Sequence, residues 1–427
     1  MLELWFDFSC PYAYLASYRA VELARAAGVE LAWKPMLLGG VFRGTGAGAG
    51  PMATLGHAKA AHNIADMKRW AERWNVPFKM PAAHPMRTVR ALRVLCALPH
   101  SRWPDAIAAL YAAYWQRVAD ITRDDVIATA LAGAGIAEAE IRDALARADS
   151  DEIKDELRRR TDEAIALGIF GAPAWVIRRD GHAPVLIWGQ DREPWVAAAL
   201  AGVELDGPAS GGPALRPVTP TRSPAPTPRR LDLFFDVASP YAYLGLTQVP
   251  ALVAETGATL RLRPILLGGL FRDIGQVDVP LFAMPKAKRE YVALDLARWA
   301  RWWGVRLDWP RKFPQRTITA QRLCIVAREA GTDVALGLAT ALGRAMWSEQ
   351  RDLEEVATLR AITVDAGGPA EWVDRTSEPA IKAALIAETA AAKATGAFGV
   401  PSWVVADGDV LWGQDRLDLV ADALVRS

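Results

Sequence analysis

The sequence predicts an α/β protein built from two tandem copies of one domain, each with strands at both ends and helices between them. The segment LELWFDFSCPYAYL (residues 2–15) returns as LDLFFDVASPYAYL (231–244), an offset of 229 residues. Farther along, LGIFGAPAWV (167–176) returns as TGAFGVPSWV (395–404). A repeat this long is no solenoid unit, so it indicates duplication of a whole domain.

A proline-rich stretch separates the two copies. Residues 206–229 hold seven prolines and three glycines among 24 residues, a composition typical of an extended linker. We therefore predict a first domain at 1–205, with a helical insertion at about 40–167, and a second at 230–427, with its insertion at about 269–395.

The first copy opens with an apolar strand at residues 2–8. Pro11 follows where proline fits best, in the first turn of a helix. Gly28 suits the end of that helix, and a second strand is predicted at 30–37. The second copy repeats the pattern with Pro240, Gly257 and strands at 231–237 and 259–266.

The middle of each copy has apolar residues at spacings of three and four, which predicts helices. Two short strands follow at 175–177 and 185–188, and a last helix after Asp191. In the second copy these are residues 403–405 and 410–412, with the helix after Asp415.

Composition excludes several classes of protein. The 50 Lys and Arg against 49 Asp and Glu leave a net charge of +1, so no basic field favours nucleic acid. No run of about 18 uncharged apolar residues predicts a membrane span, and the N-terminus does not resemble a secretory signal. Three cysteines form neither a disulfide framework nor a zinc pattern, and no metal site is predicted. We expect a soluble, cytoplasmic protein.

Three motifs occur in order in both copies: FDxxSPYxYL or its cysteine variant, FGxP, and WGQDR at 188–192 and 412–416. Through them the chain resembles 2-hydroxychromene-2-carboxylate isomerases and kappa-class glutathione transferases. This resemblance implies a DsbA-like thioredoxin fold with a helical insertion in each copy, and glutathione as cofactor.

The first motif places Cys10 and Ser239 before a helix, next to Pro11 and Pro240. Free N–H groups and the helix dipole stabilise a thiolate at that place. In the resembled isomerases a serine there binds the sulfur of glutathione, and Ser239 fits this role. Cys10 departs from it, and we expect the helix N-terminus to lower the pKa of its thiol, so that it reacts well below pH 8. Alternatively, both residues are only helix caps.

The second motif is Ala172-Pro173 and Val400-Pro401. The resemblance implies a cis proline facing the helix N-terminus, with the preceding residue pairing its backbone with the cysteinyl part of glutathione. A trans proline in an ordinary turn is the alternative.

The third motif supplies Gln190, Asp191 and Arg192, and again Gln414, Asp415 and Arg416. The resemblance implies that the Asp and Arg hold the charged γ-glutamyl end of glutathione. The alternative is that the Asp caps the last helix while the Arg is solvated.

Further candidates come from the resemblance alone. Gln276 stands where the family usually has an asparagine, and Lys59 and Lys288 correspond to family lysines that could meet a carboxylate. Either lysine could equally lie on the surface.

We predict a glutathione-dependent isomerase or transferase that acts on a small conjugated aromatic carboxylate, with Ser239 and Cys10 as catalytic residues. The alternative is a monothiol thiol-disulfide oxidoreductase using Cys10, with the second copy as a structural partner. The fusion could also act as an intramolecular pseudo-dimer.

Overall fold

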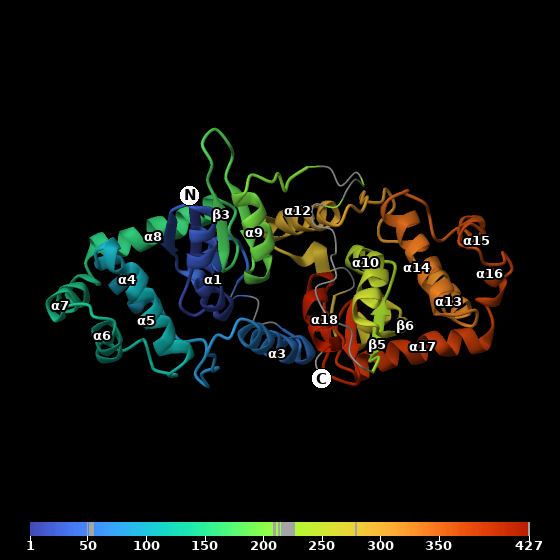
Figure 1. The fold of residues 1–427 in the computed structure, drawn as a ribbon, viewed down its shortest axis with the longest axis horizontal. Coiled ribbons are helices and arrows are strands. Elements are labelled where there is room, and N and C mark those ends of the chain that lie inside the picture. The colour runs from blue at the N-terminus through green and yellow to red at the C-terminus, as the bar shows by residue number, and fades with distance from the viewer. Residues whose placement is uncertain are drawn as a thin grey trace. The chain divides into compact units, whose positions relative to one another are not determined.

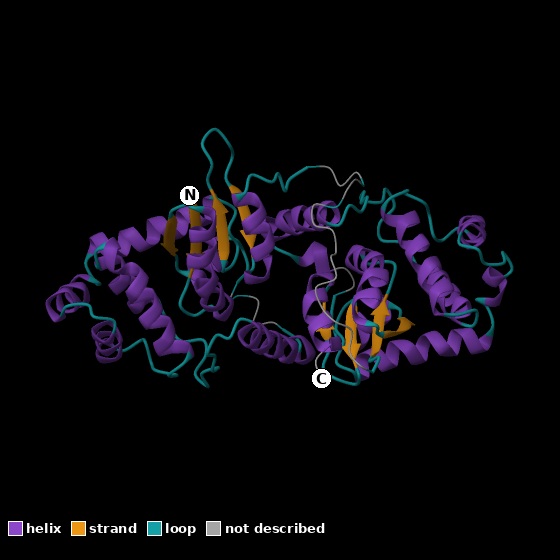
Figure 2. Cartoon of the chain, viewed as in Figure 1, coloured by secondary structure: helices purple, strands orange, loops and turns teal. Residues whose placement is uncertain are grey.

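The computed structural model describes residues 1–48, 50, 55–207, 211, 214, 227–277 and 280–425. Apart from 211 and 214, residues 208–226 of the predicted linker lie outside that set. Within it the chain forms two compact units, each with one four-stranded sheet (Figures 1 and 2).

The sheet of the first unit has the strand order β2-β1-β3-β4. β1 pairs with β2 in parallel and with β3 antiparallel, and β4 pairs antiparallel with β3. The strands are β1 (Leu2–Phe6), β2 (Leu31–Pro35), β3 (Ala174–Ile177) and β4 (Val185–Trp188). β1 is buried along its whole length, which agrees with its mainly apolar sequence; its one charged residue, Glu3, is paired with Arg178.

The second sheet has the same topology, with the order β6-β5-β7-β8. Its strands are β5 (Arg230–Phe235), β6 (Thr259–Pro264), β7 (Ser402–Val405) and β8 (Leu411–Trp412). The α/β class and the repeated strand order predicted from the sequence are confirmed.

The first helix of each copy begins at the predicted proline and ends at the predicted glycine. The helices are α1 (Pro11–Ala27) and α10 (Pro240–Thr256). Gly28 and Gly257 have φ of +63° and +68°, the left-handed conformation that glycine adopts without strain.

Helices fill the chain between β2 and β3 and again between β6 and β7, among the residues described. In the first copy they are α2 (Leu38–Gly44), α3 (His57–Arg73), α4 (Val89–Ala97), η2 (His100–Arg102), α5 (Trp103–Trp115), α6 (Asp124–Gly133), α7 (Glu138–Arg147) and α8 (Asp151–Ala166). In the second they are α11 (Leu267–Asp273), η4 (Pro280–Ala283), α12 (Lys286–Trp302), α13 (Ile318–Arg328), α14 (Thr332–Trp347), α15 (Val356–Asp365), α16 (Trp372–Arg375) and α17 (Pro379–Ala394).

A short turn of 3-10 helix and a last helix close each copy. These are η3 (Gln190–Arg192) with α9 (Glu193–Leu200), and η5 (Gln414–Arg416) with α18 (Leu417–Val425). In the first unit α1 packs against both α9 and β1. The start of α1 is thereby held at the end of β1, where the first motif lies.

Candidate functional site

Cys10 and Ser239 are the N-cap residues of α1 and α10, with extended backbone. The Ser239 hydroxyl oxygen accepts a hydrogen bond from the N–H of Ala242 at 3.3 Å, whereas the Cys10 side chain makes no cap bond. Ser239 is 6% exposed and Cys10 is 7% exposed. Both side chains therefore stand at a helix N-terminus in a nearly closed environment.

The first and second motifs meet in both copies. The Cys10 thiol donates to the carbonyl oxygen of Ala172 at 3.1 Å, and the Ser239 hydroxyl donates to that of Val400 at 3.4 Å. The peptide bonds Ala172–Pro173 and Val400–Pro401 are cis, as the resemblance implied. The pairing that the resemblance implied across about 160 residues is thus present twice.

The third motif packs directly on the second. A Cβ added to Gly171 would lie 2.9 Å from the indole nitrogen of Trp188, and one added to Gly399 would lie 2.6 Å from that of Trp412. Because such distances are too short for real atoms, only glycine admits the tryptophan of WGQDR beside the FGxP turn.

Backbone hydrogen bonds fasten the two motifs together. The N–H of Gly189 donates to the carbonyl of Pro173 at 3.1 Å, and that of Gly413 to the carbonyl of Pro401 at 3.0 Å. Gly189 and Gly413 have φ of +109° and +110°, where an L side chain is strained. The aspartate two residues later folds back over each of these glycines.

The Asp and Arg of WGQDR pair with each other. Asp191 contacts Arg192 at 2.8 Å, and Asp415 contacts Arg416 at 3.1 Å, with all four side chains mostly buried. The N-cap residue of α9 is Arg192, which makes no side-chain cap bond. The arginines are therefore not solvated, unlike in the alternative of a capping aspartate with a solvated arginine.

Gln190 leaves a donor available beside this ion pair. The residue is 3% exposed, and its amide nitrogen has no hydrogen-bond partner among the residues that the structure describes. A buried unpaired N–H costs about 1–3 kcal/mol, so a ligand carboxylate or carbonyl there would be stabilised. A zwitterionic amino-acid end, placed against Asp191, Arg192 and this amide, fits the donor set.

The expectation of an activated Cys10 thiol is wrong. Burial raises the pKa of Cys10 to about 12, and the nearby Asp7 raises it further, while backbone N–H groups of Ala13 and Tyr12 act in the opposite direction. Desolvation of the thiolate outweighs the field of the helix N-terminus. Burial also raises the pKa of Cys96 to about 12, and Cys324 is buried, so slow labelling of both thiols stays a prediction.

Sequence reasoning missed Asp7, which lies just after β1. Its carboxylate accepts hydrogen bonds from the N–H groups of Ser9 and Leu38 and from the Thr88 hydroxyl. It thus joins the residues before Cys10 to the first turn of α2 and to the start of α4, and burial raises its pKa.

Asp236 repeats this arrangement in the second copy. It accepts from the N–H groups of Ala238 and Leu267 at 2.9 and 2.8 Å and from the Thr317 hydroxyl at 2.8 Å, and its pKa is likewise raised by burial. The aspartate shared by the first motif of both copies was the signal that could have identified Asp7 and Asp236.

The remaining candidates lie in different surroundings. Lys59 is half-buried over the rings of Phe398 and Trp412, and Lys288 over the ring of Trp188. Gln276 is exposed after α11, where its backbone N–H donates to the carbonyl of Phe271 at 2.8 Å. The structure records no contact of the Gln276 side chain with the other candidates among the residues that it describes.

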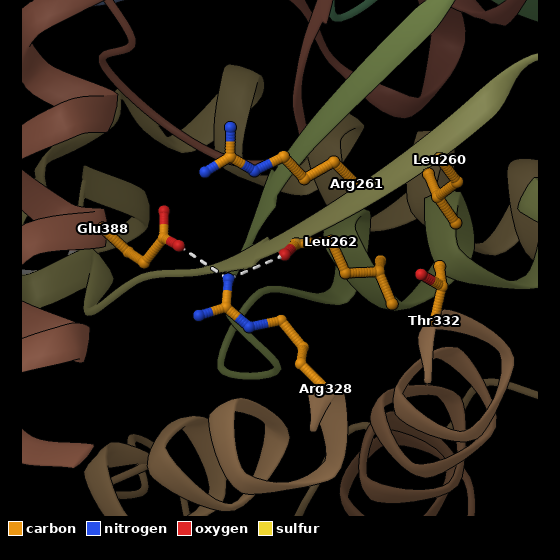
Figure 3. A pocket seen from close by; sticks show the side chains of 6 residues that line it. All are labelled: Leu260, Arg261, Leu262, Arg328, Thr332 and Glu388. Atoms are coloured by element: carbon orange, nitrogen blue, oxygen red, sulfur yellow. Dashed lines mark hydrogen bonds and ion pairs between the residues drawn. The ribbon is translucent and has the colours of Figure 1, made fainter. Parts of the chain in front are cut away.

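A separate hollow lies in the second unit along β6 (Figure 3). Two of its charged residues pair with each other: Arg328 contacts Glu388 at 2.6 Å and the carbonyl of Leu262 at 3.1 Å, and Glu388 also binds Arg263. None of the motif residues lines it, so we regard it as structural.

The described residues contain no cluster of three or more side chains suited to a metal ion. Among the helices described, none is long and apolar enough to cross a membrane.

Comparison with known proteins gives one family for both copies. A family model of the DSBA-like thioredoxin domain matches residues 1–201 and again 230–425. The human glutathione S-transferase kappa 1 is 29% identical over 211 residues, which are 47% of this chain and 92% of that protein. The 2-hydroxychromene-2-carboxylate isomerase of Sphingobium xenophagum is 28% identical over 204 residues, or 46% and 98% of the two chains.

A solved structure of a 2-hydroxychromene-2-carboxylate isomerase is also similar, with 26% identity, a TM-score of 0.41, and coverage of 46% of this chain and 94% of that one. The repeated family match and the order of the elements confirm the fold that the resemblance implied: two tandem thioredoxin domains, each with inserted helices.

Proposed function

The chain belongs to the DSBA-like thioredoxin domain family, and we propose that it is a glutathione-dependent isomerase or transferase acting on a small conjugated aromatic carboxylate. The observation that carries this proposal is the position of Ser239, at the N-terminus of α10 and within 3.4 Å of the carbonyl before cis-Pro401. The relatives named above support glutathione as the thiol and a hydroxychromene carboxylate as the kind of substrate.

In each repeat the motifs offer groups for the cysteinyl and γ-glutamyl parts of the tripeptide. The backbone N–H and carbonyl of Val400 or Ala172 would pair with the cysteinyl residue as an added strand. Asp191 and Arg192, or Asp415 and Arg416, would exchange their mutual ion pair for the ammonium and carboxylate of the γ-glutamyl end. The amide of Gln190 would gain the partner that it lacks.

Bound glutathione would supply a thiolate that adds to a conjugated double bond, permits rotation and leaves again. Ser239 would stabilise the negative sulfur by turning its hydroxyl proton from the Val400 carbonyl to the ligand. The free N–H groups at the start of α10 add positive potential at the same point. The protein would thereby orient the thiol and place hydrogen-bond donors beside its sulfur.

A calorimetric titration of the full chain with glutathione tests this proposal, together with an isomerisation assay on a hydroxychromene carboxylate. We expect saturable binding and turnover that depends on added glutathione. Turnover without glutathione, or no heat of binding up to millimolar concentration, would reject the proposal.

The oxidoreductase alternative is less favoured, because Cys10 is buried with a raised pKa. Mass spectrometry after exposure to oxidised glutathione separates the two functions. If the protein is an isomerase, we expect at most slow addition of glutathione to Cys10 at neutral pH. A monothiol oxidoreductase requires rapid addition.

A further inference from the structure

The helices α3 and α12 are each divided between the two compact units. The first turns of α3 belong to the second unit, which includes Leu55–Asn63, although the rest of α3 belongs to the first. Conversely, the first unit includes Met284–Glu290 at the start of α12, whose remainder lies in the second. Each repeat therefore contributes a short helical segment to the unit built around the other repeat's sheet.

His62 shows what this segment does in the second unit. Its Nε2 accepts a hydrogen bond from the N–H of Trp412 at 3.2 Å, and its ring lies 5.3 Å from that of Phe398. Only 8% of His62 is exposed. The segment is thus packed against the FGxP and WGQDR motifs of the second repeat.

Lys59 lies one turn earlier on the same helix. Its Nζ is 5.4 Å from the ring centroid of Trp412 and 6.0 Å from that of Phe398, within the range of cation–π attraction. Trp412 also has a buried indole N–H without an acceptor among the residues described. A cation and an unused donor therefore adjoin the motifs that would bind the tripeptide.

The reciprocal arrangement occurs in the first unit. The Nζ of Lys288 lies 6.0 Å from the ring centroid of Trp188, the tryptophan of the first WGQDR. Burial lowers the pKa of Lys288. An anionic ligand beside it would offset that desolvation.

We propose that the glutathione pockets are completed crosswise: Lys59 of the first repeat binds a carboxylate of the tripeptide in the second pocket, and Lys288 of the second repeat does so in the first. This inference rests on the proposed function for its ligand, whereas the exchange of helical segments stands on contacts within each unit. It assigns to each pocket a lysine that the sequence places in the other repeat.

Single-pocket chains test the assignment. The substitution Asp191→Ala is designed to disable the first pocket so that only the second binds glutathione, and Asp415→Ala does the reverse. Glutathione affinity is then measured by calorimetry on each full-length variant. In the Asp191→Ala chain, we expect Lys59→Met to weaken binding about tenfold, since a charge-assisted bond is lost. Lys68→Met, an exposed lysine on the same helix, is the matched control.

The mirror experiment uses the Asp415→Ala chain, where Lys288→Met should weaken binding about tenfold and the exposed Lys286→Met serves as control. The crossed assignment is overturned if Lys59→Met weakens the first pocket as much as the second, or weakens neither. Absence of glutathione binding in the unsubstituted chain would reject the proposed function and, with it, the lysines' ligand.

Hydrogen exchange without glutathione distinguishes these failures. His62→Ala should speed exchange of the Trp412 amide about tenfold or more, because its acceptor is removed, whereas the exposed His57→Ala should not. An unchanged Trp412 amide would show that the segment is not placed on the second repeat and would overturn the exchange independently of any ligand.

Discussion

The two repeats build the same framework around different reactive atoms. In both, a buried aspartate after the first strand, a cis proline and a WGQDR turn surround the N-terminus of the first long helix. Cys10 occupies that place in the first repeat and Ser239 in the second. The difference shows that the framework is preserved even where the side chain at the helix N-terminus has changed.

The environment explains why the cysteine is not simply a better nucleophile. A thiolate at Cys10 would be buried beside Asp7, whereas the Ser239 hydroxyl acts without ionising. Serine is therefore suited to assist a thiol that the ligand brings, and the second repeat should carry most of the turnover.

The largest effect is expected from Ser239→Ala. It removes the hydroxyl that would bind the sulfur, and we expect kcat/KM for the glutathione-dependent reaction to fall about 100-fold. The exposed Ser377→Ala is the control in the same repeat. A loss below twofold would mean that the first repeat carries turnover.

Replacing the buried aspartate should lower the free energy of unfolding by the same amount in each repeat. Asp7→Asn or Asp236→Asn turns an amide N–H toward groups that are themselves donors, and we expect a loss of about 2 kcal/mol near pH 4 in urea unfolding. Because burial raises the native pKa of each, the native state keeps a proton that the unfolded state releases above about 3.8, so their contribution to stability falls as pH rises.

The cost of each Asn variant should accordingly be smaller at pH 7 than at pH 4. A cost that grows with pH would contradict the raised pKa values. If the two Asn variants lose different amounts of stability, the two aspartates do not contribute equally, although their hydrogen bonds are alike.

A smaller effect is expected at the WGQDR glycines. Gly189→Ala and Gly413→Ala place a Cβ at positive φ against the neighbouring aspartate, and each should weaken glutathione binding in its own pocket about tenfold by calorimetry. Gly28→Ala is the control, since it has positive φ but no atom within 4 Å. Equal losses from all three would indicate backbone strain alone.

The smallest difference is expected between the thiols. At pH 7.5 alkylation of Cys10 should be no faster than that of Cys96, because burial raises both pKa values to about 12. Peptide mass spectrometry after timed iodoacetamide treatment measures both rates. Labelling of Cys10 more than tenfold faster would restore a redox role for the first repeat.

Much of the fold could be predicted because the same sequence pattern occurs in both repeats. Prolines and glycines marked where α1 and α10 begin and end, and the apolar runs located all eight strands to within a few residues. The meeting of Cys10 with Ala172, and of Ser239 with Val400, came from the resemblance rather than from any local pattern.

Two kinds of information could not be read from the sequence. The pKa of Cys10 depends on the balance of desolvation and helix field, which requires knowing that the side chain is buried. The contacts of Lys59 and His62 join residues more than 330 positions apart, and no spacing rule predicts which unit the start of α3 belongs to.

The bond between His62 and Trp412 bears on how the protein behaves at high concentration. β8 is the outermost strand of its sheet and has only two residues, and an uncovered strand edge invites pairing between molecules. The His62 imidazole accepts the hydrogen bond of the Trp412 N–H, so this donor is not available to a strand from another molecule. The same histidine therefore helps to protect the chain from edge-to-edge aggregation.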